Sequence, residues 1–371
     1  MTNPSTGAYQ SRGRNRARRA RRWLVAVASV ATLGLIAWPV MSYFEIPPFT
    51  DKGDPVSYGQ AGGGEGGKGG DAKTLMPTGP QASFKNVKTL SDGTHVSVVT
   101  LDGKKSGFKG KVWVWAPKEY TDDPKFASSG FPVMIALPGG PGNDSNYWSV
   151  GEFKQSKTST ESYSLEKSIS TWYQQGKSKP FLLAMPILNP GPDDKGIYWD
   201  GSDIPDQPKM GTWLTEDVPD LMKANFRTIK SRDGWSYMGS STGGFASLKS
   251  VLKHPDKFKT AIANGPDIVP DSPLWRGHEK EKAENNPEVL AKQLAATKGP
   301  DVYIAFQYGT KENAKMIADV KKFMATYGKG PVHTKLWEIP GGTHNAGTYL
   351  SNMAEPTKWI SDQMEGPTPS S

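Results

Sequence analysis

Hydrophobic and polar positions follow one another through most of the chain in patterns typical of strands and helices. The alternation of residues in Lys111–Trp115 indicates a strand, and Val87–Thr100 together with Gly110–Ala116 predicts an opening hairpin. Phe131–Leu137 and Phe181–Leu188 are continuous apolar runs, which are typical of strands buried on both faces of a sheet. The pattern therefore predicts strands of two kinds, half-exposed and fully buried.

The second half of the chain alternates between helix and strand patterns. Apolar residues recur at helical spacing in Trp213–Phe226, Thr242–Lys253, Asn313–Tyr327 and Ala346–Met364. Short apolar runs between them predict strands at Gly234–Met238, Thr260–Ala263, Val302–Gln307 and Thr334–Ile339. This alternation predicts an α/β domain over about residues 83–366, with a mostly parallel central sheet and helices on both faces.

A long apolar segment lies near the N-terminus. From Trp23 to Phe44 the chain has 22 residues without a charge. As a helix they would extend about 33 Å, enough to cross a hydrocarbon core of about 30 Å. Seven arginines precede this segment and Glu45 is the first charge after it, which predicts a cytoplasmic N-terminus. We therefore expect a basic cytoplasmic tail over residues 1–22, a transmembrane signal-anchor over residues 23–44 and an extracytoplasmic domain.

A cleaved signal peptide is the competing hypothesis, because a basic stretch followed by an apolar one also fits secretion. The segment is longer than the apolar core of a typical signal peptide. Its end, Trp38–Phe44, is poor in the small residues of a cleavage site. Cleavage would make the protein secreted, and a soluble cytoplasmic protein is the third possibility.

Residues 45–82 are predicted to form a flexible linker, because their prolines and the glycine run at residues 62–70 cannot bury a core. The glycine run matches a dinucleotide-binding fingerprint by chance, since the pattern predicts neither a strand before it nor a helix after it. We expect the folded domain over residues 83–366 and a disordered tail over residues 367–371.

Charge and composition exclude several classes of function. The net charge is +8, but residues 1–22 hold seven of the 45 basic residues and no acid, which leaves 38 Lys and Arg against 37 Asp and Glu. The basicity therefore belongs to the N-terminus and does not indicate nucleic-acid binding. The chain has no cysteine, which excludes disulfides, a thiol nucleophile and cysteine-bound zinc. It contains no metal-binding motif and no phosphate-binding loop, so we expect no cofactor and no metal.

The candidate nucleophile is Ser241, in the G-x-S-x-G sequence Gly239–Gly243. The motif falls where a predicted strand turns into a predicted helix, which is the position of a nucleophile elbow. Such a strained turn leaves no room for nearby Cβ atoms, so small residues are needed around the serine. The alternative is an ordinary glycine-rich turn.

Five histidines could supply the base, and His344 has the favoured position. It lies in a loop after the last predicted strand and before the last predicted helix. In α/β-hydrolases the triad follows the chain order serine, acid, histidine, with the histidine at that location. The other four lie in the opening hairpin, at a helix end, in an irregular segment or at a strand start: His95, His254, His278 and His333.

The acid should follow the strand that precedes the histidine loop. That strand ends in the turn Gln307–Asn313, in which Glu312 is the only acidic residue. Asp319 is one or two helical turns further on, where a solvated position is expected. Asp267 and Asp271, one strand earlier, are the alternatives.

An oxyanion hole needs two backbone N–H groups, one from the residue after the nucleophile and one from a loop after an early strand. Thr242 would supply the first, and Gly140 in the loop Leu137–Gly142 would supply the second. Aromatic residues in loops after strands could line a substrate pocket, although aromatic side chains more often serve packing. We expect substrate contacts from Tyr147, Trp148 and Trp199.

At these residues the sequence resembles the esterase family of esterase D type, which includes mycolyltransferases and feruloyl esterases. The elbow, the Leu137–Gly140 loop, the Gly309–Asn313 turn and the Gly341–Asn345 loop carry the resemblance, which covers about residues 108–362. It implies an α/β-hydrolase fold and an exported actinobacterial member of the family. It also implies Ser241, Glu312 and His344 as the triad, with Gly140 and Thr242 giving the oxyanion amides.

The sequence thus predicts an extracytoplasmic serine esterase, held at the membrane by its N-terminal helix. It would cleave the carboxylic ester of a small molecule, lipid or glycan through an acyl-enzyme. The first alternative is an acyltransferase that passes the acyl chain to a sugar or lipid alcohol. The second is an inactive scaffold that binds cell-wall glycan or a partner protein.

Overall fold

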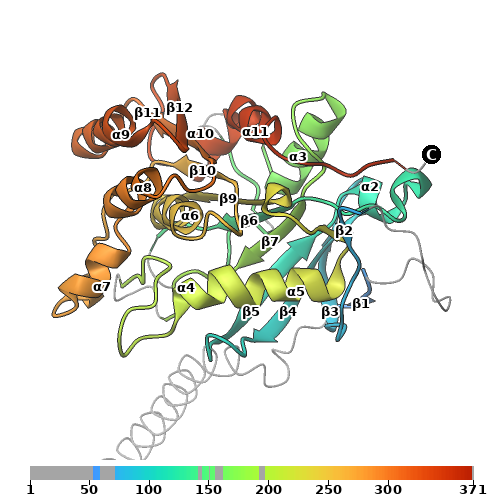
Figure 1. Cartoon of the computed structure of the whole chain (residues 1–371). Coiled ribbons are helices and arrows are strands. Elements are labelled where there is room, and N and C mark those ends of the chain that lie inside the picture. Colours follow the sequence, from blue (N-terminus) through green and yellow to red (C-terminus); the bar gives the residue numbers. More distant parts are fainter. Residues whose placement is uncertain are drawn as a thin grey trace, which may run out of the picture. The chain divides into compact units, whose positions relative to one another are not determined.

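A computed structural model of the protein describes residues 53–58, 72–140, 144–149, 151–154, 162–191 and 197–369. Its main element is a ten-stranded sheet in the order β1-β3-β4-β5-β7-β6-β9-β10-β11-β12 (Figure 1). Neighbours from β7 to β12 are parallel, whereas those from β1 to β7 are antiparallel. The predicted α/β architecture with a mostly parallel sheet is confirmed.

The strands of this sheet are β1 (Pro55–Val56), β3 (Phe84–Thr89), β4 (His95–Asp102), β5 (Lys109–Trp115), β6 (Val133–Leu137), β7 (Leu182–Pro186), β9 (Trp235–Ser240), β10 (Thr260–Asn264), β11 (Val302–Gly309) and β12 (Val332–Ile339). A small second sheet pairs β2 (Thr74–Leu75) with β8 (Thr228–Ile229).

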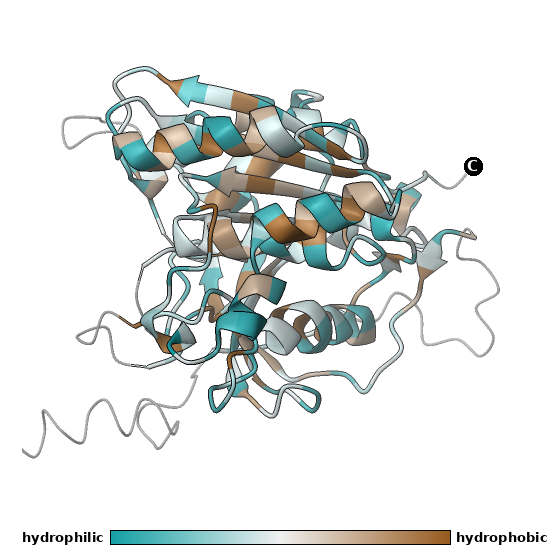
Figure 2. Ribbon diagram, turned by 60° about the vertical axis from the view of Figure 1, so that its left-hand side comes forward, coloured by the Kyte–Doolittle hydropathy of each residue, from teal (hydrophilic) through white to brown (hydrophobic). Residues whose placement is uncertain are grey.

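The central strands are buried on both faces, as their continuous apolar runs predict. In β6, Val133, Ile135 and Leu137 pack into one hydrophobic cluster, while Met134 and Ala136 pack into another on the opposite face. Side chains alternate across a strand, so a strand covered on both sides needs apolar residues at every position. Figure 2 shows the result as hydrophobic central strands beneath helices of mixed character.

Helices cover both faces of the sheet (Figure 1). The first cluster receives side chains from α5 (Val218–Asn225), α6 (Thr242–Lys253), α8 (Pro287–Ala296) and α9 (Ala314–Tyr327). The second receives them from α3 (Leu165–Gln174), α10 (Ala346–Ser351) and α11 (Ala354–Ser361). The remaining helical segments are short: α2 (Lys118–Thr121), α4 (Met210–Thr212) with the π-helical turn Trp213–Asp217, α7 (Glu279–Glu284), and the 3₁₀ turns Pro124–Phe126, Arg232–Gly234 and Pro273–Trp275.

The predicted flexible linker over residues 45–82 is wrong for the parts that the structure describes. Pro55–Val56 extends the sheet by pairing with β3, and Thr74–Leu75 pairs with β8. Tyr58 is buried, and its hydroxyl bonds to Ser97. Composition gave the wrong prediction here because strands of two residues are too short to show a period of hydrophobic and polar positions. The glycine run itself lies outside the described residues.

Two predicted elements are divided in the structure. The expected strand Val87–Thr100 is broken by a turn, in which the Leu90 N–H bonds to the Thr94 carbonyl. The expected helix Ala346–Met364 ends at Ser351, and a second helix begins at Ala354. Pro356 explains the second break, because proline lacks the N–H of a helix interior but fits a first turn.

The predicted signal-anchor at residues 23–44 lies outside the described residues, as does the basic tail. Among the residues that the structure describes, none of the helices is both long and apolar enough to span a bilayer.

Candidate active site

The candidate nucleophile lies in a strained turn between β9 and α6. Ser241 has φ 56° and ψ −123°, a conformation that residues with a Cβ rarely adopt. Its N–H donates to the Asn264 carbonyl at 2.9 Å, which fixes the turn against β10. A Cβ on Gly239 would lie 2.3 Å from the Gly243 oxygen, and one on Gly243 would lie 2.4 Å from the Pro138 oxygen. Both glycines of the motif are therefore required by close backbone contact.

Glu312 and His344 come together from the ends of adjacent strands. The Nδ1 atom of His344 lies 2.6 Å from Glu312 Oε2, while Glu312 Oε1 accepts the Gly309 N–H at 2.6 Å. The Glu312 side chain is completely buried, whereas that of His344 is 49% exposed. The two loops lie so close together that a Cβ on Gly309 would be 2.2 Å from the Gly342 carbonyl carbon. Among the predicted acids, the structure brings Glu312 to the imidazole.

Helix caps hold the two loops in place. Asn313, directly after Glu312, accepts the Lys315 and Met316 N–H groups at the start of α9. Asn345, directly after His344, accepts the Gly347 and Thr348 N–H groups at the start of α10. Such a cap stabilises a helix by about 1 kcal/mol. Glu312 and His344 therefore each lie directly before the residue that caps a helix.

Tyr349 is part of this cluster and was missed from the sequence. Its hydroxyl donates to Glu312 Oε2 at 2.8 Å and lies 2.9 Å from His344 Nδ1. Tyr349 is 1% exposed. Its burial, and to a lesser extent the neighbouring Glu312 carboxylate, raise the pKa of its hydroxyl well above the usual value. The hydroxyl thus stays protonated and can donate to the acid. The predicted helix after His344 could have indicated it, because Tyr349 lies one turn into that helix.

The surroundings of His344 favour its protonated form. The hydrogen bond to Glu312 raises the pKa of the imidazole above its usual 6.5, although burial opposes the shift. The Asp267 carboxylate contributes in the same direction. A base that gains a proton readily from an adjacent serine is suited to nucleophilic catalysis.

The predicted oxyanion residues lie beside the nucleophile. Gly140 has φ 91°, a backbone conformation that favours glycine. Its carbonyl accepts the Asn189 side-chain amide at 2.8 Å, and the same amide contacts Thr242 Oγ1 at 3.2 Å. Asn189 therefore joins the two segments that would supply the oxyanion amides. The sequence analysis overlooked it, although a polar residue directly after the apolar run Phe181–Leu188 is a recognisable signal.

The three predicted substrate aromatics have different places. The prediction is wrong for Trp148, which is fully buried in the core and donates its indole N–H to the Leu137 carbonyl at 2.9 Å. Tyr147 bonds through its hydroxyl to the Gly139 N–H at 2.6 Å and to Ser240 Oγ at 2.5 Å. Trp199 is partly buried, and its indole N–H bonds to Gln207 at 3.2 Å. Neither Tyr147 nor Trp199 lines the cavity formed by the described residues, so their contact with substrate stays a prediction.

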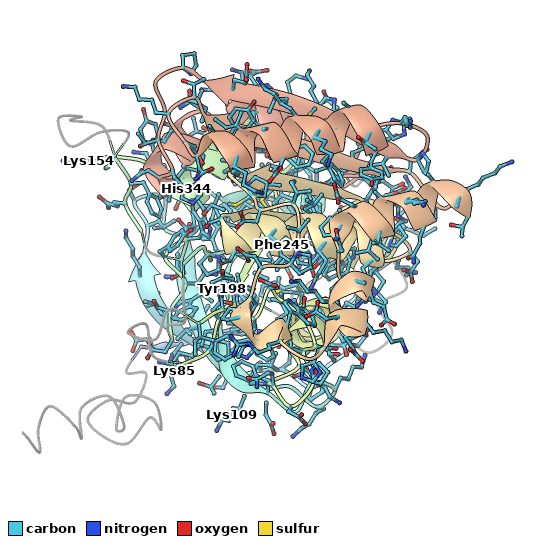
Figure 3. The ribbon with its side chains drawn as sticks, turned by 90° about the vertical axis from the view of Figure 1, so that its left-hand side faces the viewer. Lys85, Lys109, Lys154, Tyr198, Phe245 and His344 are labelled. Carbon is cyan, nitrogen blue, oxygen red and sulfur yellow. The ribbon has the colours of Figure 1, made fainter. Side chains whose placement is uncertain are left out.

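Ser241 and His344 line one cavity of about 480 Å³. Its wall comes from the loop after β10 and from the start of α9, and consists of Gly265, Asp267, Ile268, Val269, Asp271, Asn313, Lys315, Met316 and Asp319. Figure 3 shows His344 and Tyr198 on the same side of the molecule, near the first turn of α6 that carries Phe245. Asp267 and Asp271, the alternative acids, thus lie in the cavity wall.

The other histidines have separate surroundings. His95 bonds to Thr89 at 3.0 Å, and His333 bonds to Asp301 at 3.0 Å. His254 ends α6, where burial lowers its pKa to about 4, and His278 precedes α7. Within the described ranges, no group of three or more histidine, aspartate or glutamate side chains is arranged to hold a metal ion.

Comparison with known families agrees with this geometry. Residues 106–361 match the family described as "Putative esterase", which is more than half of the chain. The chain belongs to this esterase family. It is therefore a member of a family of carboxylic ester hydrolases, and it has the α/β-hydrolase fold.

Individual relatives of this chain are distant. It is 22% identical over 274 residues to an uncharacterised protein of Corynebacterium glutamicum, with 70% of this chain and 59% of that protein covered. It is 30% identical over 145 residues to the S-formylglutathione hydrolase of Mus musculus, with 35% of this chain and 48% of that enzyme covered. The match thus spans about half the length of these curated relatives.

Among solved structures, this chain is similar to FphF, a fluorophosphonate-binding serine hydrolase of Staphylococcus aureus. The TM-score is 0.56 at 14% identity, with 72% of this chain and 98% of that chain covered. At this identity the likeness shows the shared fold.

Proposed function

We propose that this protein is an extracytoplasmic serine esterase that uses Ser241, His344 and Glu312 as its catalytic triad. The observation that carries the proposal is the 2.6 Å contact between His344 and the buried Glu312, beside a serine in a strained strand-to-helix turn on the same cavity. Family membership supports the reaction class, and the fluorophosphonate-binding hydrolase supports an activated serine by analogy.

In the first half-reaction, His344 Nε2 removes the Ser241 hydroxyl proton as Oγ attacks the ester carbonyl. Glu312 orients the imidazole through Nδ1 and stabilises the imidazolium that forms. The N–H groups of Gly140 and Thr242 would stabilise the oxyanion. The alcohol then leaves with the proton from His344, and Ser241 carries the acyl group.

In the second half-reaction, His344 removes a proton from water, which attacks the acyl-enzyme and releases the acid. The 49% exposure of the His344 side chain favours water as the acceptor. A sugar or lipid alcohol in place of water would make the protein an acyltransferase. Incubation with an ester donor and such alcohols distinguishes the two, because only transfer produces new esters.

A burst experiment with the full-length protein tests the proposal. Mixing with para-nitrophenyl butyrate should release about one nitrophenolate per protein in a fast phase, followed by slower turnover. Ser241→Ala should abolish both phases. Ser240→Ala is the matched control. It removes the hydroxyl of the residue next to Ser241, which bonds to Tyr147, and it should retain acyl-enzyme formation. Release of nitrophenolate by Ser241→Ala at the wild-type rate would contradict the assignment.

The membrane location is proposed on the sequence of residues 1–45. The uncharged segment Trp23–Phe44, with seven arginines before it, supports a single anchor with the domain outside. Cell fractionation with N-terminal sequencing of the mature protein tests this. Intact protein in the membrane fraction, digestible from outside the cell, is expected. A mature N-terminus beyond Phe44 would show secretion, and intact protein in the cytosol would contradict the proposal.

A further inference from the structure

One wall of the candidate active-site cavity is rich in carboxylates. Asp267 and Asp271 come from the loop after β10, and Asp319 comes from α9. Among the described lining residues, Lys315 is the one lysine or arginine, and its Nζ lies 2.6 Å from Asp319 Oδ2. Lys315 and His344 also act electrostatically on Asp267, and Lys282 acts on Asp271, but among the described residues none of the three forms an ion pair with either loop carboxylate.

Neither loop carboxylate forms an ion pair with the part of the chain that the structure describes. Asp271 accepts a hydrogen bond from the Tyr198 hydroxyl. Partial burial and the neighbouring Asp271 raise the pKa of Asp267 to about 6, so it is ionised at pH 8. The pKa of each carboxyl stays raised, so the neighbouring cations offset the cost of burying two like charges together only in part. The energy is recovered when a cation enters the cavity.

The loop that carries these carboxylates is firmly held. Asp200 Oδ2 accepts the Ser272 N–H at 3.2 Å and the Trp275 indole N–H at 2.6 Å. Asp200 is held in turn by the buried Lys249 of α6, whose Nζ contacts the Asp200 carbonyl at 3.2 Å. The charges are thus fixed relative to α6, the helix that begins directly after Ser241. Electrostatic recognition is strongest when the recognising groups are preorganised.

We propose that the preferred substrate is an ester carrying a positive charge, an ammonium group a few bonds from the ester carbonyl, which Asp267 and Asp271 recognise. This inference rests on the proposed esterase function of Ser241 and His344. The cavity is the site of reaction because these two residues line it, independently of the carboxylates. Ile268, Val269 and Met316 provide apolar wall for the methylene groups between the ester and the ammonium.

Paired substrates test the charge and show which side of the ester bears it. For the acyl side, para-nitrophenyl ε-aminocaproate is compared with para-nitrophenyl heptanoate, in which a methyl group replaces the ammonium. For the alcohol side, choline butyrate is compared with its isostere, in which a tert-butyl group replaces trimethylammonium. With the full-length protein at pH 8, kcat/KM should favour the cationic member of at least one pair by about tenfold, equivalent to about 1.4 kcal/mol.

Variants of the wall should change this ratio in opposite directions. Asp267→Asn and Asp271→Asn should each reduce the preference to about threefold or less, since each removes one recognising charge. Lys315→Met should increase it, because Asp319 loses its partner. Asp122→Asn, an exposed carboxylate outside the cavity, should leave it unchanged. The ratio cancels any effect on the triad that both esters share, so a general loss of activity cannot imitate the result.

Ser241-dependent hydrolysis of the neutral esters, with no cationic preference in either pair, would overturn the inference and leave the proposed function standing. A preference that survives in the double variant Asp267→Asn, Asp271→Asn would also overturn it. If no ester is hydrolysed and a fluorophosphonate does not label Ser241, the proposed function fails and the inference fails with it.

Discussion

Two sets of carboxyl groups lie at the candidate active site, and they differ in what holds them. Glu312 is completely buried, and its oxygens accept the Gly309 N–H and the Tyr349 hydroxyl and contact His344. Asp267 and Asp271 lie in the cavity wall and have no ion pair among the described residues. The first carboxylate has a fixed partner inside the protein, whereas the other two are available to a partner from outside.

This difference separates reaction from recognition. A carboxylate that orients a base must be desolvated and satisfied by internal donors, so that its position does not depend on substrate. A carboxylate that recognises a cation must keep its charge without an internal partner. The contacts of a carboxyl group therefore indicate its role better than its proximity to the nucleophile does.

The largest effect should come from the nucleophile. Ser241→Ala should lower kcat/KM for a neutral ester by about 10⁴-fold or more, because it removes the hydroxyl proposed to form the acyl-enzyme. Steady-state kinetics with para-nitrophenyl butyrate measures it, with circular dichroism as the folding control. A decrease of less than tenfold would place the reaction elsewhere.

Glu312→Gln should follow, with a decrease of about 10³- to 10⁴-fold in kcat, since the amide cannot stabilise the imidazolium. Asp271→Asn should change kcat for the same neutral ester by less than threefold. These two variants test the comparison directly, because each replaces a carboxylate by the corresponding amide. Equal losses at both positions would show that the distinction between reacting and recognising carboxylates is wrong.

Trp148→Ala should act on stability. The side chain is fully buried and bonds to the Leu137 carbonyl, and removal of such a residue costs about 3–5 kcal/mol of unfolding free energy. Chemical denaturation measures the change. A stable Trp148→Ala protein with altered substrate preference would instead support the predicted contact of Trp148 with substrate.

Tyr349→Phe should lower kcat about tenfold and leave KM nearly unchanged. It removes a donor to a charged acceptor that positions His344, and such hydrogen bonds contribute about 1.5–3 kcal/mol. Tyr308→Phe is the matched control, because its hydroxyl bonds to Glu338 on the neighbouring strand at 2.7 Å. Similar losses in both variants would indicate a general packing effect.

The smallest effect should be a shift in pH dependence. His344 acts as a base only when neutral, and the Glu312 hydrogen bond raises its pKa, so kcat/KM should rise with a midpoint above pH 6.5. Asp267→Asn removes an anion that favours the imidazolium, so the midpoint should move to lower pH. A midpoint that moves upward in this variant would contradict the electrostatic arrangement.

The sequence indicated which residues meet at the candidate active site, because each of them has a local signal. Ser241 lies in a short motif, while Glu312 and His344 lie at strand ends and precede helix-capping asparagines. The same reasoning failed at Trp148, because a loop position does not show whether a side chain points into a pocket or into the core. It also failed at Pro55–Val56 and Thr74–Leu75, since pairing with distant strands leaves no periodic pattern in two residues.

The recognition role proposed for Asp267 and Asp271 could not be predicted from local sequence signals, for a different reason. Asp267 and Asp271 were weighed as triad acids from their place after β10. Their proposed role depends on their lacking an ion-pair partner among the described residues, which spacing along the chain cannot show. Asn189 lies between these cases, because its position at a strand end was visible but its contact with Gly140 was not.

Covalent labelling tests the central claim most directly. The full-length protein is treated with a fluorophosphonate probe, and the modified peptide is identified by mass spectrometry in the wild type, Ser241→Ala and His344→Ala. The account predicts a single adduct on Ser241, none in Ser241→Ala and much slower labelling in His344→Ala. A folded wild-type protein that stays unlabelled, or one labelled on another residue, would contradict an activated serine at this site.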